Sequence, residues 1–498
     1  MHGNAKEQSE ISEEKEIVEI AMIQAMGKEE YGNLTISQLQ KALDENAGKG
    51  KTISYSVLSR FVIKFNDKNR YYEVDEKGNV SDAIYREKIE YAGDITKGGR
   101  CKGTADNPYE ISCVEDLVAF SRSSNQNGTN NRNYILTRDI DMASYFSYDN
   151  YTTTEYDTYL GGDGTNDLIT QLSMNGNGFV PIGYANNKSF DGIFNGNGKK
   201  IKNLYVNFSN SYVGFFGRVK GDGDGAVIRN LTLDCVINSR DASFTGGIVG
   251  LLVSDGYNNG IAKIENCLVY GKINAKLQSA GGIVGLARGY VDFLDCINYA
   301  EVTSPKVSGG ICGRMESGHN INFKNVGNYG TIIWTGNSTH EGAGGIVGEG
   351  NTGNIIVENG FNSGEIKSTA TNTNKTFSAI GGIVGNTNSM VSLTIKNTFN
   401  IGALTAINAN VGGIAGKKSN NSSNTITLVN CYYKNANINN GIGNVSDEEG
   451  VVGKNEEYLI SEAFVNTLNS NLEEDYAKWI YNKNQYPTLD FKTKWHNT

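Results

Sequence analysis

Residues that could do acid–base or metal chemistry are few in this sequence of 498 residues, which contains four histidines. Zinc hydrolases place two histidines on one helix turn in the pattern His-Glu-x-x-His. The nearest match, at His340 and Glu341, has no second histidine. His319 follows a glycine-glycine strand whereas His340 precedes one, so we expect them at different corners of the fold. We predict no catalytic, cofactor-binding or metal-binding residue, no cofactor and no enzymatic activity.

Two acidic loops are the next candidates for chemistry. Residues 161–168 approach a calcium-binding nonapeptide repeat, but the pattern occurs once and has Asn166 where aspartate is expected. Asp222 and Asp224 lie in a glycine-rich insertion. Carboxylates suit Ca²⁺, but a site needs six to eight oxygen ligands, so two carboxylates alone are too few. We interpret both segments as structural loops.

The seven cysteines do not form a fully paired set, because their number is odd. Cys101 and Cys113 flank a turn-rich stretch, and we predict a disulfide between them. It would close a short loop and contribute about 3 kcal/mol. The alternative is that they are two unrelated small core residues.

Composition excludes several classes of protein. The chain has 61 glycines, 4 prolines and 38% hydrophobic residues, which is typical neither of collagen nor of a disordered chain. A net charge of −9 argues against a nucleic-acid partner, which would need clustered lysine and arginine. No apolar run reaches the roughly 20 residues of a transmembrane helix, and no signal peptide opens the sequence.

A change in composition marks a domain boundary near residues 92–100. Residues 1–95 contain 31 charged residues and 7 glycines, and the rest of the chain is much poorer in charge and richer in glycine. Hydrophobic spacing in this first segment predicts a helix around residues 11–25, a second around 37–43, and strands at 61–65 and 71–74. We therefore expect a small α/β domain.

A repeat dominates the chain from about residue 213. A Gly-Gly-Ile-Val-Gly motif and its variants recur every 28 to 37 residues, starting at Gly246, Gly281, Gly309, Gly344, Gly381 and Gly412, with a divergent copy at Val213. A second column recurs in phase with it: Asn266, Asp295, Asn325, Asn359, Asn397 and Asn430. Repeats of this period indicate solenoids, propellers or arrays.

The repeat unit predicts a right-handed parallel β-helix. Each unit holds two or three short Ile/Val-rich runs between Gly/Asn corners, which favours strands over helices. Stacked coils put equivalent residues above one another, so the asparagine column should form a structural ladder of amide hydrogen bonds. The glycine pairs would allow either positive φ or close approach by a neighbouring coil. Cys267, Cys296 and Cys431 fall in the next column, and we interpret them as buried packing thiols.

These repeats resemble the GLUG motif of Gram-positive surface adhesins and of the non-catalytic region of M26 immunoglobulin A proteases. The flanks agree, because residues 103–112 resemble the opening motif of that family and residues 479–489 its closing element. The resemblance implies a surface β-helix, and the missing zinc motif means that protease activity is not carried over.

The first segment resembles the globular part of type IV pilin-like (prepilin-type) surface proteins. The resemblance rests on residues 5–18, 32–43 and 71–80. Such proteins begin with a cleaved leader and a hydrophobic helix half, and this sequence starts in the polar part of the helix. The resemblance therefore implies a trimmed or lost natural start. The alternative is a generic α/β cap on the next domain.

Four regions follow from these patterns. They are a pilin-like α/β module (1–95), an N-terminal cap with the first coils (96–189), the repeat β-helix (190–445) and a C-terminal cap with a helix (446–498). An open coil end exposes unpaired strand edges, so a lid is expected at each end. Ser112 begins one candidate helix with Leu117, and Ser461 begins another with Phe464 and Leu468.

The sequence favours a mainly β, non-catalytic adhesin or display protein that is extracellular, at a bacterial cell surface or on a pilus. Its partners would be glycans or proteins of a host or bacterial surface, and other pilin-like subunits. Loops such as 367–379 would present the binding surface, and nearby Trp334 could stack on a sugar or be half-exposed packing. The alternatives are a structural filament subunit without a ligand and a polysaccharide-active enzyme.

Overall fold

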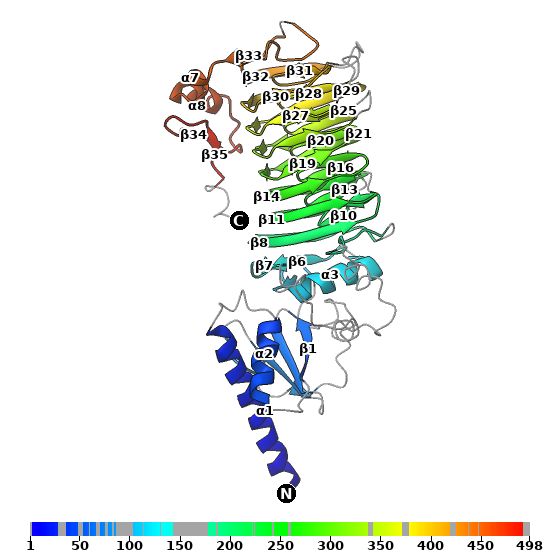
Figure 1. The fold of residues 1–498 in the computed structure, drawn as a ribbon, viewed down its shortest axis with the longest axis vertical. Coiled ribbons are helices and arrows are strands. Elements are labelled where there is room, and N and C mark those ends of the chain that lie inside the picture. Colours follow the sequence, from blue (N-terminus) through cyan, green and yellow to red (C-terminus); the bar gives the residue numbers. More distant parts are fainter. Residues whose placement is uncertain are drawn as a thin grey trace.

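The computed structural model describes most of the chain, with gaps. The described residues are 2–27, 36–47, 53–58, 60–65, 70–74, 78–81, 84–85, 103–112, 114–129, 131–142, 178–185, 188–221, 223, 225–241, 244–256, 260–336, 342–370, 378–418, 425–436, 438–446 and 448–491. Most of them lie in parallel strands that stack into one β-helix, with a small α/β domain at its N-terminal end (Figure 1). The predicted mainly β solenoid is confirmed.

The N-terminal domain packs two helices on an antiparallel sheet. The helices are α1 (His2–Met26) and α2 (Ile36–Ala47), and the sheet order is β1 (Ile53–Leu58), β2 (Arg60–Phe65), β3 (Arg70–Val74) and β4 (Ile84–Tyr85). Val18 and Met22 recur at helical spacing and bury against Ile63 and Tyr72. The buried Glu14 accepts a hydrogen bond of 2.7 Å from the hydroxyl of Tyr72, which ties the helix to the sheet.

The solenoid is built from two parallel sheets that share one core. The smaller has seven strands, one from each glycine repeat: β9 (Tyr212–Val213), β12 (Phe244–Gly246), β15 (Ser279–Gly281), β20 (Val307–Gly309), β24 (Gly342–Gly344), β28 (Ala379–Gly381) and β31 (Asn410–Gly412). Equivalent residues pair in register, for example Gly281 with Gly309. The repeat in the sequence is therefore the coil of the fold.

The larger sheet wraps round the other sides of each coil. The strands that open it are β5 (Tyr109–Ile111), β6 (Asn133–Leu136), β7 (Ile140–Asp141) and β8 (Ile193–Phe208). Those that follow each glycine motif are β10 (Phe216–Lys220), β13 (Val249–Ser254), β16 (Val284–Gly289), β21 (Cys312–Lys324), β25 (Val347–Glu358) and β29 (Val384–Asn400). The remainder are β11 (Ala226–Ser239), β14 (Ala262–Asn274), β17 (Val291–Leu294), β18 (Ile297–Asn298), β19 (Glu301–Ser304), β22 (Gly327–Asn328), β23 (Ile332–Trp334), β26 (Phe361–Asn362), β27 (Ile366–Ser368), β30 (Leu404–Thr405), β32 (Ile426–Lys434) and β33 (Val451–Lys454).

The glycine pairs of the repeat allow neighbouring coils to approach closely. A Cβ on Gly310 would lie 2.0 Å from the carbonyl oxygen of Gly345 on the next coil and 2.6 Å from Cγ of Asn328. The glycine residues with positive φ are elsewhere in the described chain. Of the two roles that the sequence allowed for these pairs, the structure has the close contact.

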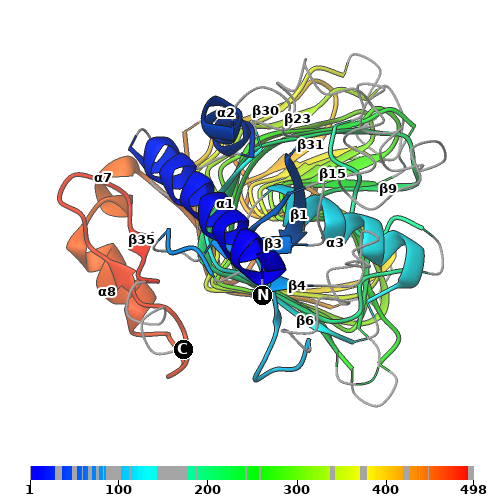
Figure 2. The same ribbon diagram turned by 90° about the horizontal axis from the view of Figure 1, so that it is seen from below.

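A helix covers the N-terminal end of the solenoid. In α3 (Val114–Asn127), Leu117 and Phe120 are buried against the first coils, with the Phe120 ring stacked on Tyr134 at 4.1 Å. The carboxylate of Asp116 accepts hydrogen bonds from the backbone N–H and the hydroxyl of Ser112. Figure 2 shows α3 lying across the end of the coils.

The C-terminal element lies along the flank of the solenoid. It comprises α7 (Glu456–Leu459), α8 (Glu462–Asn469), β34 (Trp479–Ile480) and β35 (Thr488–Leu489). Ser461 caps α8 as expected, since its hydroxyl accepts from the N–H of Phe464. Figures 1 and 2 show this element beside the coils, where it covers an outward apolar column that includes Phe361 and Phe399. We call residues 455–491 the flank strap.

The lid expected over the C-terminal end therefore lies on the side. The outer face of the last coils is apolar and needs cover, and the strap supplies it. The end of the core is closed by side chains of the last coil itself, among them Tyr433, Val445 and Val451. Within the described part of the chain, no helix has the length and apolar character required to span a membrane.

Candidate ligand-binding groove

The predicted asparagine column forms one corner of each coil. Asn266, Asp295, Asn325, Asn359, Asn397 and Asn430 all have φ between 49° and 56°, the left-handed region that asparagine tolerates better than other non-glycine residues. The Nδ2 groups of Asn325, Asn359 and Asn397 donate to the Oδ1 atoms of Asp295, Asn325 and Asn359, at 2.7, 2.8 and 3.0 Å. The corner residue thus shapes the backbone and links neighbouring coils.

This corner column extends beyond the predicted set and is interrupted within it. Asn266 donates to Asn230, and Asn230 donates to Asn195, so the ladder starts two coils earlier. Asp295 can accept but its carboxylate cannot donate onward. Oδ1 of Asn397 has no hydrogen-bond partner among the described residues, so the ladder ends below Asn430.

A second asparagine column lies inside the solenoid and was not predicted. Asn298, Asn328, Asn362 and Asn400 are fully buried and form hydrogen bonds of 2.7–2.8 Å from coil to coil. Each also donates to the backbone carbonyl two residues later, as Asn328 does to Gly330. The signal was present in the sequence, as Asn-x-Ala or Asn-x-Gly two residues after the cysteine column.

Cys267, Cys296 and Cys431 are free and buried, as predicted, and so are Cys235 and Cys312. Their thiols contact carbonyl oxygens of the neighbouring coil, for example Sγ of Cys296 with Ile264 at 3.4 Å. Burial raises the pKa of Cys312 and of Cys431 to about 12. Thiolate is the reactive form, so these groups are inert at neutral pH.

Other predicted positions take no part in a site. Trp334 is fully buried in the core, which corrects both interpretations of it, as a sugar platform and as a half-exposed residue. Cys101, Cys113, His340, the loop 161–168, Asp222 and Asp224 lie outside the described residues. So does most of the 367–379 loop. Among described residues there is no group of three or more potential metal ligands.

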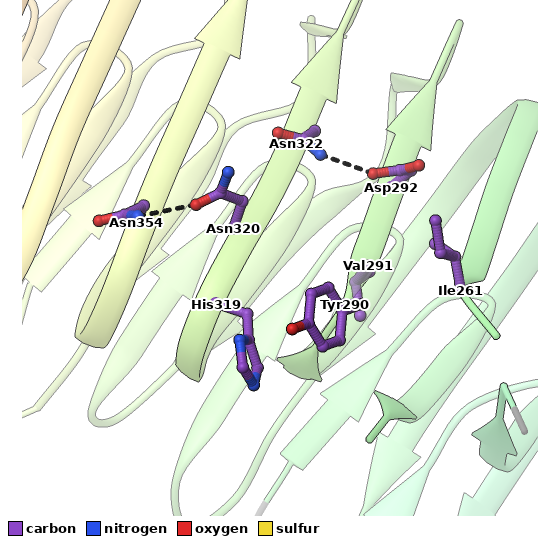
Figure 3. Close-up of a pocket in the computed structure, with 8 residues that line it drawn as sticks. All are labelled: Ile261, Tyr290, Val291, Asp292, His319, Asn320, Asn322 and Asn354. Carbon is purple, nitrogen blue, oxygen red and sulfur yellow. Dashed lines mark hydrogen bonds between the residues drawn. The ribbon is translucent and has the colours of Figure 1, made fainter. Parts of the chain in front are cut away.

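The structure has a groove at another corner of the solenoid, on the side where β16 turns into β17 (Figure 3). Its volume is about 340 Å³, within the range of small-molecule sites. Six of its eight lining side chains carry polar groups, and the lining comes from four successive coils: Ile261, Tyr290, Val291, Asp292, His319, Asn320, Asn322 and Asn354. This groove is the candidate functional site.

Two local irregularities position the aromatic residues of the groove. Gly289 has φ of +84°, and a Cβ there would lie 1.5 Å from the carbonyl oxygen of Ser254, so this turn before Tyr290 requires glycine. In β21 the pairing with β25 is interrupted by extra residues between Glu316 and Asn320. Such a bulge redirects a side chain. His319 belongs to it and stacks on the Tyr290 ring with centroids 4.0 Å apart.

The polar groups of the groove are only partly satisfied by one another. Asn354 donates from Nδ2 to Oδ1 of Asn320 at 2.7 Å, and Asn322 donates to Oδ1 of Asp292 at 2.8 Å. Within the described residues, the Asn320 amide N–H groups, Oδ1 of Asn354 and Oδ2 of Asp292 have no further protein partner. Tyr290 is 38% exposed. The groove can therefore both donate to and accept from a ligand.

This arrangement fits recognition by hydrogen bonds. Amides, a phenol, an imidazole and one carboxylate match hydroxyl groups, which donate and accept at the same atom. Sequence reasoning missed the groove because Tyr290 and His319 do not fall in one repeat column. The weak signal was a glycine followed by an aromatic ring in two successive coils, Gly289-Tyr290 and Gly318-His319.

Comparison with known proteins gives short, distant matches. No known family model matches the chain. Over 194 residues, 39% of this chain, it is 30% identical to halomucin of Haloquadratum walsbyi, and the match covers 2% of that protein. Over 178 residues, 34% of this chain, it is 27% identical to a "Putative Gly-rich membrane protein" of Evansella cellulosilytica, covering 16% of it. The chain thus spans a small part of both curated relatives.

Two solved structures match the chain at low similarity. One is a "putative immunoglobulin A1 protease" from Bacteroides ovatus, at 22% identity and a TM-score of 0.46, covering 80% of this chain and 97% of that one. The other is an IgA1 protease, at 14% identity and a TM-score of 0.34, covering 74% of this chain and 25% of that one. The GLUG and pilin-like resemblances stay predictions.

Proposed function

We propose that this chain is a non-catalytic display protein of a bacterial cell surface, whose β-helix binds a glycan in the groove at Tyr290, His319 and Asn320. The observation that carries the proposal is the set of unpaired donors and acceptors held on a rigid scaffold. Glycans present many hydroxyl groups and few charges, and a site of amides and aromatic rings matches them.

A surface location is part of the proposal. One curated relative is named as a membrane protein, and the other is named halomucin. The low charge of the coils and the absence of clustered basic residues fit neither nucleic-acid binding nor an acidic-peptide partner.

The absence of catalysis is also proposed. Most glycoside hydrolases use two carboxyl groups on either side of the bond to be cleaved. Asp292 is the only carboxylate among the eight described residues that line the groove. A single carboxylate that already accepts a hydrogen bond from Asn322 is better suited to binding.

A glycan array on the full chain tests the proposal. The tightest glycan would then be titrated by calorimetry against the wild type, Tyr290→Phe and Asn320→Ala. Tyr290→Phe keeps the ring on His319 and removes only the hydroxyl. We expect each variant to bind about tenfold more weakly, the equivalent of about 1.4 kcal/mol.

The matched control is Asn274→Ala. Asn274 also donates to an asparagine of the next coil, Asn238, at 2.9 Å, but it does not line the groove. It should bind as the wild type does. Absence of glycan binding, or equal binding by groove and control variants, would overturn the proposal. Release of reducing ends from the bound glycan would instead support an enzyme.

A further inference from the structure

The groove runs parallel to the solenoid axis. Its polar lining comes from equivalent positions on successive coils, because Asn320 pairs with Asn354, and Val291 pairs with Ile321 on one side and Ala262 on the other. Ile261, Tyr290, Asn320 and Asn354 therefore form a single column across four coils. Figure 3 shows these residues following one another from strand to strand.

This geometry sets the shape of the ligand. Neighbouring strands lie ~4.8 Å apart, so four coils extend over roughly 14 Å along the axis. A single sugar ring would reach only part of the column. An extended chain of sugars would meet all four coils.

The hydrogen-bonding groups also repeat along the axis. In the first column, Asn320 has amide N–H groups to donate and Asn354 has an oxygen to accept. In the second column, two residues further along each strand, Asp292 and Asn322 have oxygens to accept. Two parallel polar columns can hold the two edges of one extended chain.

The charges around the groove select against an anionic chain. Asp292 is the only acidic side chain among the described residues that line the groove. Lys263 lies opposite Asp292 on the neighbouring strand, so these two opposite charges balance, and Arg288 and Arg314 lie 2.5 and 3.2 Å from the carboxylate of Glu316. The groove therefore offers a uronate or sulfated chain no surplus of positive charge.

We infer that the ligand is an uncharged, linear polysaccharide, bound extended along the solenoid axis over the coils that carry Ile261, Tyr290, Asn320 and Asn354. This inference rests on the proposed function and deepens it by naming the class and orientation of the glycan.

A size series tests this inference. The probe is a set of fragments of one to six sugars, cut from the glycan that binds tightest on the array, and the measurement is the Kd of each fragment. We expect the Kd to fall at least tenfold as fragments lengthen, and then to become constant once the chain spans the groove. Asn354 lies at one end of the column. In Asn354→Ala the Kd should therefore become constant at a shorter fragment length than in the wild type.

Asn320 lies in the middle of the column. Asn320→Ala should therefore raise the Kd of every fragment that is long enough to span the groove. Asn274→Ala is again the control and should leave the series unchanged. A single sugar that binds as tightly as the longest fragment would overturn the extended orientation, and an anionic glycan as the tightest ligand would overturn the uncharged class. Both outcomes differ from a failure of the proposed function, in which no glycan binds.

Discussion

Two columns of asparagine run through the same solenoid, one at a corner and one inside. The corner column, from Asn230 to Asn430, keeps its left-handed backbone in every coil, including those without a ladder hydrogen bond. The inner column occupies four coils, and none of its members has positive φ. Asparagine serves the backbone at the corner and serves other buried amides inside.

The difference shows why the two columns tolerate replacement differently. A corner needs a residue that tolerates positive φ, so glycine should substitute there with little loss. An inner position needs a side chain that fills its hydrogen bonds, because a buried unpaired amide costs about 1–3 kcal/mol. The inner column also explains the second glycine of the four motifs that face it, since Gly345, for example, lies directly against Asn362.

The largest effect should come from Asn362→Ala in the inner column. Asn362 donates to Asn400 and to the carbonyl of Gly364, and it accepts from Asn328, so three buried groups lose a partner. We expect a loss of about 3 kcal/mol in the free energy of unfolding, measured by urea denaturation. Asn362→Gly should be no better. A loss below about 1 kcal/mol would mean that the inner ladder contributes little.

The next largest loss of stability should distinguish a corner residue that the flank strap covers from one that it does not cover. Asn359 donates to the carbonyl of Ala477 at 2.9 Å and accepts from Nε1 of Trp479 at 2.5 Å, whereas Asn266 makes its ladder bond to Asn230. Asn359→Gly should cost about 2 kcal/mol more than Asn266→Gly, because the strap loses its polar anchors. Hydrogen exchange should then increase at residues 475–479. Unchanged exchange there would contradict this role of Asn359.

A smaller effect tests the backbone role of the corner. At Asn266, alanine and glycine remove the same amide, but alanine disfavours the φ of 50°. We expect Asn266→Ala to be about 1 kcal/mol less stable than Asn266→Gly in thermal unfolding. The same pair at Asn328, in the inner column, should show no advantage for glycine. Equal stability of the two Asn266 variants would remove the distinction between the columns.

The smallest change in stability should come from the cysteine column, which lies between the two asparagine columns. Burial raises the pKa of Cys431 from 9.0 to about 12, so folding keeps this thiol protonated. Because the unfolded chain loses this proton near pH 9 and the folded chain near pH 12, the free energy of unfolding is unaffected below pH 9. It falls progressively as the pH rises towards 12. At pH 9.5 the loss from this one group is ~0.8 kcal/mol.

Cys431→Val removes the ionisable group and has a natural precedent, because Val326 fills the equivalent place three coils away. Its melting temperature should match that of the wild type at pH 8 and fall less steeply between pH 8 and 10. Parallel pH profiles for the two proteins would show that Cys431 does not set the alkaline limit.

The sequence was sufficient to predict the coil and the corner column, because both repeat in phase with the glycine motif. The inner column repeats as well, but a polar residue pointing into a strand core runs against the expected alternation, so Asn298 and Asn362 were not considered. The groove depends on a bulge that brings His319 onto Tyr290, and an irregularity of one coil leaves no periodic signal.

The position of the strap could not be predicted from its own pattern. The apolar residues Phe464 and Leu468 would suit a lid over the end as well as a cover for the side. What decides between them is the outward column of Phe361 and Phe399, and the sequence does not show which face of a short strand points outward.

Because the flank strap is attached to the side of the stack at Asn359 and its neighbours, its contacts do not depend on the number of coils in the fold. A coil duplicated between β8 and β14 would raise the height of the stack and leave every contact of residues 475–479 in place. Such a protein can gain or lose whole coils through recombination at its repeats and keep the same contacts between the strap and the solenoid.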